Sequence, residues 1–313
     1  MHQAFTIRTI VCNLSIAGLV GILACSAAVA EDGDKLTLAD GDRRIATYNA
    51  GLVEYHDKAQ PYYSRSGFIH PLYTPKGLVV TAPFSDTHAH QHGLMFAWRE
   101  AKIDGRPVDF WNSKKQQGRI EHVQTVHAGA DKIVVRLHHV DQTTKPETIA
   151  LKETWEITRV PHPTLNVFDL VSTQVCVMKV PLVVCKFHYG GMCVRGTEAW
   201  LDNVKTVTSE GKDHEKGNHT QPNWVAMFGR IKGQPCGLAA MSHPSNFRGP
   251  QPSRLTGSPY FCFAPMFLGE FELQPDKPYV SRYRFVAYDG DPDADALNKL
   301  WKSFADDSPT RNK

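Results

Sequence analysis

The chain has 313 residues, of which 42% are hydrophobic and 10% aromatic, and its formal net charge is only +3. A chain of this length can bury a sizeable core, and one large β-sandwich domain can be this long. The weak charge gives no argument for a nucleic-acid partner or for an anionic membrane surface.

The first thirty residues have the pattern of a secretory signal peptide. Arg8 precedes an uncharged apolar run that ends in Ala28-Val29-Ala30. A basic start, an apolar middle and a small-residue end are typical of such a leader. We therefore predict a signal peptide over residues 1–30 and a single secreted or periplasmic domain over residues 31–313.

Two other fates of the N-terminal segment stay open. The apolar run could act as a transmembrane anchor, or Cys25 could carry a lipid anchor because Ile22-Leu23-Ala24-Cys25 loosely resembles a lipobox. After the leader, no stretch approaches the ~18 apolar residues that span a bilayer, so no transmembrane span is expected in the mature chain.

Five cysteines follow the leader: Cys176, Cys185, Cys193, Cys236 and Cys262. Their odd number allows at most two internal disulfides. No C-x-x-C pattern occurs, which argues against a thiolate zinc site. Buried free cysteines in strands are favoured over disulfides.

The rest of the chain shows strand patterns separated by turns. The predicted strands are Arg44–Ala50, Leu78–Phe84, Arg119–His127, Lys132–Val140, Thr148–Val160, Thr164–Met178, Leu182–Val194, Trp224–Ile231, Cys236–Met241, Tyr260–Glu272 and Tyr279–Tyr288. Helical spacing appears only over Asp293–Phe304. Strands without intervening helices predict an all-β fold, a large antiparallel β-sandwich with a short C-terminal helix.

The most informative motif is a row of Asp86, His88, His90 and His92. In an extended strand these four side chains would project from one face. One reading is a site for a divalent metal, with the histidines and Asp86 as ligands. A second is metal-free acid/base chemistry by a histidine. A third is a loop of solvated or hydrogen-bonded histidines.

Two further polar clusters are candidate walls of the same site. His188 and Arg195 flank Gly190-Gly191, a pair that allows close backbone approach. The other cluster contains His243, Asn246 and Arg248, whose amide and guanidinium suit hydroxyl or carboxylate recognition. No following helix supports a phosphate cradle after the glycine pair, so no nucleotide cofactor is expected.

Several motifs occur in an order that is similar to a known family. They are His70-Pro71-Leu72-Tyr73-Thr74-Pro75, the histidine row with Gly93-Leu94, Asp109-Phe110-Trp111, Gly118-Arg119-Ile120, His243-Pro244-Ser245-Asn246 and Tyr283-Arg284-Phe285. Over roughly residues 60–300 the chain resembles the secreted bacterial "methane oxygenase, PmoA-like" family, a domain of unknown function. The resemblance implies a secreted all-β domain often encoded beside sugar-degrading genes.

The chain departs from that family at two places. The family motif has two adjacent histidines before the glycine, whereas Gln91 separates His90 from His92 here. The family also tends to carry a carboxylate before the paired glycines, where this chain has His188-Tyr189. The strand pattern is also similar to the two-sheet sandwich of galactose-mutarotase-like proteins, which bind sugars on a concave sheet.

These observations lead to three functional hypotheses. The first is a secreted carbohydrate-active protein, a hydrolase, lyase or epimerase that acts on a sugar or modified sugar. Its acid/base candidates are His88, His90, His92, His188 and His243, and its substrate-binding candidates are Arg195, Trp111, Trp224, Asn246 and Arg248. The second is a non-catalytic module that binds glycans or other small molecules through Trp111, Trp224 and Arg248. The third is a redox metalloenzyme, which the family label implies.

Overall fold

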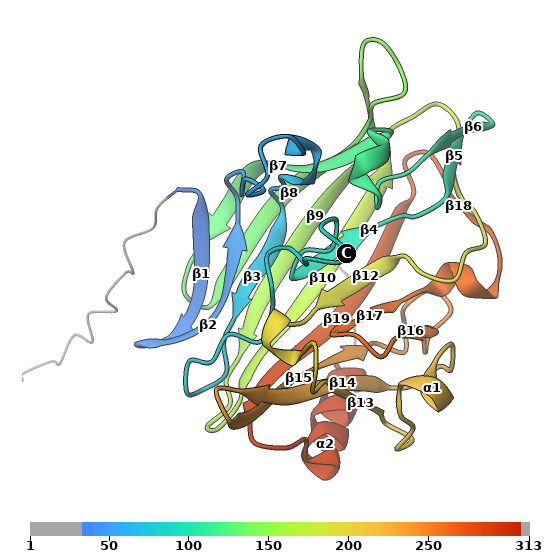
Figure 1. Ribbon diagram of the computed structural model, residues 1–313. Helices are drawn as coiled ribbons and strands as arrows, with labels where there is room; N and C mark the ends of the chain where they lie inside the picture. The colour runs from blue at the N-terminus through green and yellow to red at the C-terminus, as the bar shows by residue number, and fades with distance from the viewer. Residues whose placement is uncertain (1–32, 308–313) are drawn as a thin grey trace, which may run out of the picture.

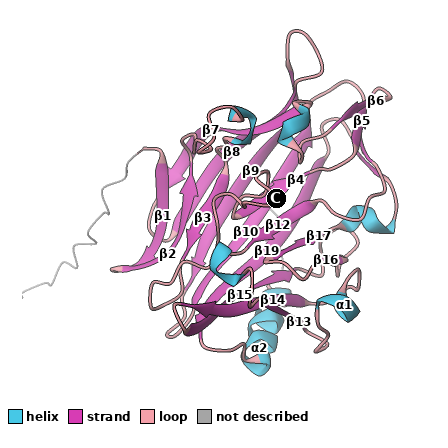
Figure 2. Ribbon diagram, viewed as in Figure 1, coloured by secondary structure: helices cyan, strands magenta, loops and turns pink. Residues whose placement is uncertain are grey.

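The computed structural model describes residues 33–307, so the predicted leader and the Cys25 anchor lie outside the described residues. Strands make up most of the molecule, and helices lie at its margins (Figure 2). The named strands pair only antiparallel to one another within this range. The prediction of an all-β antiparallel architecture is confirmed.

Two large sheets lie one in front of the other (Figure 1). The seven-stranded sheet has the order β1 (Lys35–Asp40), β2 (Arg43–Asn49), β3 (Phe68–Leu72), β4 (Leu94–Ala97), β12 (Gly191–Arg195), β17 (Tyr260–Phe263) and β16 (Ser253–Leu255). The eight-stranded sheet has the order β13 (Lys205–Thr208), β14 (Trp224–Ile231), β15 (Gln234–Ser242), β19 (Pro278–Asp289), β10 (Asn166–Cys176), β9 (Thr148–Val160), β8 (Lys132–Asp141) and β7 (Gly118–Ala128).

A small sheet and short helices complete the fold. The small sheet has the order β18 (Phe271–Leu273), β11 (Leu182–Val184), β5 (Ala101–Ile103) and β6 (Arg106–Val108). The α-helices are α1 (His214–Gly217) and α2 (Ala294–Ala305), and 3-10 helices span Pro61–Tyr63, Ser113–Lys115, Glu198–Trp200 and Pro265–Leu268.

The core between the large sheets follows from strand alternation. On β8 the side chains of Ile133, Val135 and Leu137 are buried, while the residues between them are more exposed. Phe96, Met192 and Phe263 come from the other sheet and belong to the same hydrophobic cluster. Burial of apolar surface on both inner faces holds the sheets together.

The C-terminal helix covers the outer face of the eight-stranded sheet. Asp293 caps α2 by accepting a hydrogen bond from the Ala296 amide, as its sequence position predicts. Leu297 and Phe304 are buried in a second hydrophobic cluster that also contains Trp224 of β14. The predicted helix over Asp293–Phe304 is therefore confirmed with a shift of one residue.

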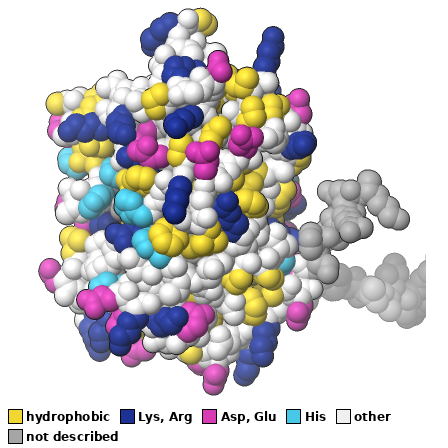
Figure 3. All heavy atoms as spheres, turned by 90° about the vertical axis from the view of Figure 1, so that its right-hand side faces the viewer, with side chains coloured by type: hydrophobic (Ala, Val, Ile, Leu, Met, Phe, Trp, Pro, Cys, Tyr) yellow, Lys and Arg dark blue, Asp and Glu magenta, His cyan; other side chains and the backbone are white. Residues whose placement is uncertain are grey.

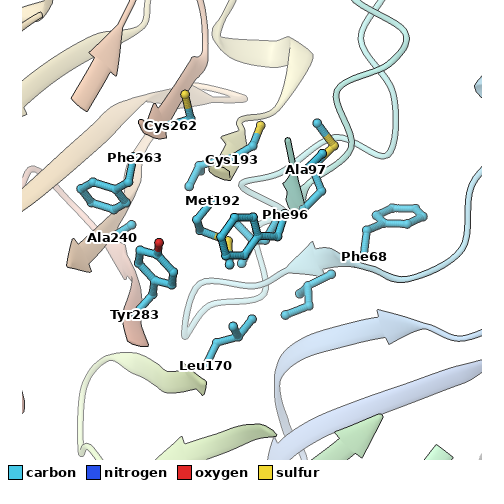
Figure 4. Packing of buried hydrophobic residues seen from close by; sticks show 14 of the residues in the cluster. Phe68, Phe96, Ala97, Leu170, Met192, Cys193, Ala240, Cys262, Phe263 and Tyr283 are labelled. Atoms are coloured by element: carbon cyan, nitrogen blue, oxygen red, sulfur yellow. The ribbon is translucent and has the colours of Figure 1, made fainter. Parts of the chain in front are cut away.

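The outer face of the seven-stranded sheet is also covered, and this decides where the site lies. All five residues of β12 are buried, including Arg195. Figure 4 shows the sulfur atoms of Cys193 and Cys262 on the side of the strands away from Phe96, Phe263 and Tyr283. These two cysteines are directly paired across β12 and β17, and Arg195 is paired with Tyr260. Alternation places all four side chains on the outer face.

Three strand predictions are wrong. Residues 260–272 are divided between β17 and β18, which belong to different sheets, with a 3-10 helix between them. Residues 78–84 form only isolated bridges at Val79 and Thr81 instead of a strand. Residues 182–194 are divided between β11 and β12, which belong to different sheets. Gly191 begins β12 at φ +83°, and a Cβ there would lie 2.4 Å from the Phe263 carbonyl oxygen. The glycine pair thus allows close strand packing.

The five mature cysteines are free, and only Cys185 is not fully buried. This confirms the preference for buried free cysteines over disulfides.

Candidate functional site

The histidine row lies in a turn, so the prediction that its side chains share one face of a strand is wrong. The Gln91 amide donates a 2.8 Å hydrogen bond to the His88 carbonyl oxygen, which closes the turn. Gly93 then enters β4 at φ +39°, and a Cβ there would lie 2.1 Å from the Ile69 carbonyl oxygen. The turn places the three imidazoles in different environments.

His92 points into the protein. Its side chain is 2% exposed, and its Nδ1 lies 2.9 Å from the Pro83 carbonyl oxygen. The rings of Phe68 and Phe84 pack against it. Burial holds the pKa of His92 well below its ordinary value. The ring of His92 therefore fixes the turn from inside the protein, and the catalytic role predicted for His92 stays a prediction.

His88 and His90 line a cavity of about 170 Å³, which we call the histidine pocket. The loops contribute His88, His90, Gln91, His188 and Tyr189. Strands β16 and β17 and their connection contribute Arg254, Thr256, Ser258 and Tyr260. The structure thus brings two of the three row histidines together with His188, as predicted for a composite site. Figure 3 shows histidine side chains gathered on the surface beside hydrophobic and basic groups.

The electrostatics of the pocket favour neutral imidazoles. Burial and then the neighbouring His88 lower the pKa of His90 to about 4. Burial and the charge of Arg195 lower the pKa of His88, and burial and Arg254 lower that of His188. At neutral pH all three rings can therefore accept a proton or a hydrogen bond.

Arg195 does not itself line the histidine pocket but holds Gln91, which does, and the substrate contact predicted for Arg195 stays a prediction. The Arg195 side chain is fully buried and donates to the carboxylate of Glu198 at 2.8 Å. It also donates to Gln91 Oε1 at 3.3 Å. Arg195 therefore positions the Gln91 amide, which lines the histidine pocket.

Tyr189 is held by a second polar network. Its hydroxyl lies 3.2 Å from Arg99 Nε, and Arg99 forms an ion pair with the buried Asp109 at 3.1 Å. Burial would raise the pKa of Asp109, but hydrogen bonds from Asn112 and the charge of Arg99 bring it below its ordinary value. The network fixes the tyrosine ring at the pocket wall.

The predicted metal ligands do not form one site. His88 and His90 lie beside each other in the pocket, but Asp86 is exposed outside its lining and His92 is buried in the protein. Among residues 33–307, no group of three or more His, Cys, Asp or Glu side chains could hold a metal ion.

The cluster around His243 makes packing and hydrogen-bond contacts within the protein, and the functional roles predicted for its three residues stay predictions. His243 is 2% exposed and packs on Phe304 of α2. Asn246 exchanges hydrogen bonds with the backbone of Arg282, and the guanidinium of Arg248 donates to the carbonyl oxygens of Pro265, Gly269 and Glu270. None of the three lines the histidine pocket.

The two tryptophans predicted to bind substrate are both buried. Trp224 is 1% exposed and donates its indole hydrogen to Asn298 of α2, on the other side of the eight-stranded sheet. Trp111 is 1% exposed and packs against Tyr189 and Tyr260. Trp111 therefore lies behind the pocket wall and does not offer a sugar-stacking face to solvent.

A family model described as a family of unknown function, DUF6807, matches residues 35–302. The chain belongs to the DUF6807 family. This match shows a family of unknown function and does not itself carry the PmoA-like name. No curated protein matches the sequence significantly.

Two solved structures share a general likeness with this DUF6807 protein. A galactose mutarotase related enzyme from Lactobacillus acidophilus matches with 9% identity and a TM-score of 0.37, over 81% of this chain and 97% of that chain. A protein from Synechocystis sp. PCC 6803 matches with 11% identity and a TM-score of 0.35, over 83% and 94%. At these values the comparison supports no statement about function.

The sequence did not predict the part of the histidine pocket of this DUF6807 protein that comes from β16, β17 and their connection. Arg254, Thr256, Ser258 and Tyr260 carry no recognisable motif. The only available signal was alternation in β17, which places Tyr260 on the same face as Cys262.

In the part of the chain that the structure describes, no helix is long and apolar enough to cross a membrane.

Proposed function

We propose that this DUF6807 protein is a carbohydrate-active protein whose histidine pocket binds a sugar or modified sugar and transfers a proton, as in an epimerase or lyase. The observation that carries this proposal is the placement of His88, His90 and His188 as neutral imidazoles in one cavity. A neutral histidine can take a proton from a hydroxyl or an acidic carbon.

The other pocket groups suit a hydroxylated ligand. Gln91, Thr256 and Ser258 can exchange hydrogen bonds with sugar hydroxyls, and Arg254 supplies positive charge. Burial raises the pKa of Tyr260 well above its ordinary value, so the phenol stays protonated; it donates to Cys262 Sγ at 3.1 Å, which leaves its oxygen to accept. The cavity is smaller than the ~300–1,000 Å³ of typical drug-sized sites, which favours a small sugar or one end of a glycan.

Proton transfer fits the pocket better than glycoside hydrolysis. Most glycosidases use two carboxylates on either side of the scissile bond. No Asp or Glu belongs to the pocket lining within the described residues. We therefore place epimerase or lyase chemistry ahead of hydrolysis.

The test is turnover of a sugar panel by the purified mature protein. NMR would follow monosaccharides, uronic acids and oligosaccharides for changes at the anomeric carbon, inverted centres or unsaturated products. His90→Ala should lower kcat at least about 100-fold, the usual contribution of an acid/base group. The matched control is His127→Ala, on the exposed part of β7.

Unchanged turnover in His90→Ala would overturn the assignment. Sugar binding without turnover by the wild-type protein would support the alternative of a non-catalytic glycan-binding module.

We also propose that the protein is exported to the periplasm or secreted. The support is the leader pattern over residues 1–30, and residues 31–313 would then form the single mature domain. N-terminal sequencing and intact mass of protein from cell fractions test this. A mature start at Glu31 is expected, whereas a lipidated Cys25 would show a membrane-anchored form.

A further inference from the structure

Two adjoining cavities lie near the 3-10 helix Pro61–Tyr63, and neither shares a lining residue with the histidine pocket. The outer cavity has a volume of about 550 Å³ and the inner one about 30 Å³. They share five lining residues, so they adjoin each other: Tyr62, Ser64, Ser113, Gly118 and Arg119. On this scale a single water needs about 10–15 Å³, so the inner cavity has room for roughly two water-sized groups, the size of one carboxylate.

Three residues that line the inner cavity carry buried donors without a partner. They are Nε and one terminal nitrogen of Arg65, Nε1 of Trp111 and Oγ of Ser113. Buried donors are nearly always paired, because leaving one unpaired is costly. Three such residues around one small cavity therefore indicate a missing acceptor.

The charges around the inner cavity indicate that the missing acceptor is negatively charged. Arg65 is 8% exposed and forms no ion pair among the described residues, although Glu153 acts on it at longer range. Burial lowers its pKa to about 10, which leaves the guanidinium protonated at neutral pH. Within the described part of the chain, no Asp or Glu lines either cavity.

We propose that the inner cavity binds a single negatively charged group, the carboxylate of a small organic acid, and that the outer cavity holds the rest of that molecule. The carboxylate would accept hydrogen bonds from Arg65, Trp111 and Ser113, and charge-assisted bonds of this kind are the strongest that side chains form. The outer cavity is lined by Tyr62 and by polar groups such as Gln116 and Gln142, which suit a hydroxylated body. This proposal does not depend on the proposed chemistry of the histidine pocket.

Calorimetry and thermal unfolding of the mature protein test the proposal with sodium glucuronate, glucose and sodium bromide at constant ionic strength. Glucuronate should bind and raise the melting temperature, because a ligand that binds only the native state stabilises it. Glucose, which lacks the carboxylate, should bind at least 10-fold more weakly.

Substitutions at three positions locate the site. Trp111→Phe keeps an aromatic ring but removes the N–H, and Ser113→Ala removes the hydroxyl; each should weaken glucuronate binding roughly 10-fold. Arg65→Met should abolish binding, and Arg65→Lys should restore part of it. Ser245→Ala, an exposed serine beside α2, is the control and should bind like wild type.

The outcomes are distinct. Bromide binding that depends on Arg65, with no glucuronate binding, would assign the inner cavity to a free halide and overturn the carboxylate proposal. No effect of any anion on wild type, or unchanged binding in Trp111→Phe and Ser113→Ala, would overturn the anion site altogether. If the Arg65 variants do not fold, the other two variants still decide.

Discussion

At the scale of single residues, burial decides what each histidine can do. His88, His90 and His92 are equally spaced in sequence, yet His88 is exposed, His90 is half-buried and His92 is enclosed. The same type of side chain therefore yields a pocket-edge group, a candidate base and a structural support. Sequence spacing could identify the cluster but not these three environments.

The lowered pKa of His90 predicts an unusual titration. Its imidazole should stay neutral until the pH approaches about 4. NMR of the ring protons should show a midpoint near that pH, and the signal should vanish in His90→Gln. Any turnover that uses His90 as a base should likewise fall only in this acid range. A midpoint near the ordinary value of about 6.5 would contradict the described burial.

Stability should also fall with acid. His70 and His90 both have pKa values lowered to about 4 by burial. Below about pH 6.5 the unfolded chain takes up protons at these sites while the folded chain does not, so the free energy of unfolding decreases as pH falls. Urea unfolding at pH 7 and pH 5 should differ by roughly 1–2 kcal/mol per site after allowance for partial exposure. His70→Gln and His90→Gln should flatten this dependence.

At the scale of elements, helix α2 could be predicted from the sequence, whereas the turn before β4 could not. The helix carries its own signals, an N-cap at Asp293 and apolar residues at helical spacing. The turn depends on contacts with distant chain, such as the close approach of Gly93 to Ile69 of β3. Its conformation could not be predicted because no local pattern encodes that contact.

Gly93→Ala should disrupt the histidine pocket more than the fold. The new Cβ would collide with the Ile69 carbonyl oxygen and face an unfavourable positive φ. We expect a loss of a few kcal/mol in unfolding free energy and displacement of His88 and His90. Circular dichroism and ligand binding measure the two effects. Gly77→Ala, also at positive φ but with open space around it, is the control for backbone strain alone.

Helix α2 should contribute to stability but not to ligand binding. Phe304→Ala removes a buried ring that packs on His243 and should cost about 3–5 kcal/mol. Asp293→Ala removes the N-cap and should cost about 1 kcal/mol. Both variants should keep wild-type affinity at the histidine pocket. A loss of affinity at the histidine pocket in Phe304→Ala alone would support a functional role for His243.

At the scale of the whole molecule, a buried polar network joins the two large sheets. Glu153 of β9 accepts hydrogen bonds from Trp155 and Ser172 and lies 2.7 Å from His139 Nε2. Gln174 also donates to Glu153 and accepts from Trp98, which follows β4. The sequence placed Glu153 and His139 on strands, but only the pairing register of β8 with β9 in the eight-stranded sheet shows that their side chains meet.

Glu153→Ala should therefore be among the most damaging core substitutions. Burial raises the pKa of Glu153, but the hydrogen bond and charge of His139 outweigh burial and lower it. Removing the carboxylate leaves several buried donors unpaired and should cost about 3–5 kcal/mol. Urea unfolding measures the loss, and Glu156→Ala, at an exposed position of the same strand, is the control. Equal stability of the two variants would show that the network carries no net energy.

The sequence by itself determined the all-β class, the long strands β7 to β10 with their hairpin, and the C-terminal helix, because alternation, turn residues and capping are local signals. It also indicated that the histidine row and His188 lie close together, and His88, His90 and His188 do line one cavity. Only the tertiary structure decided that His243, Asn246, Arg248 and Trp224 serve packing, and that Arg254 and Tyr260 complete the pocket. The reason is physical: whether a polar side chain meets solvent, a ligand or another element depends on which face of a sheet a distant segment covers.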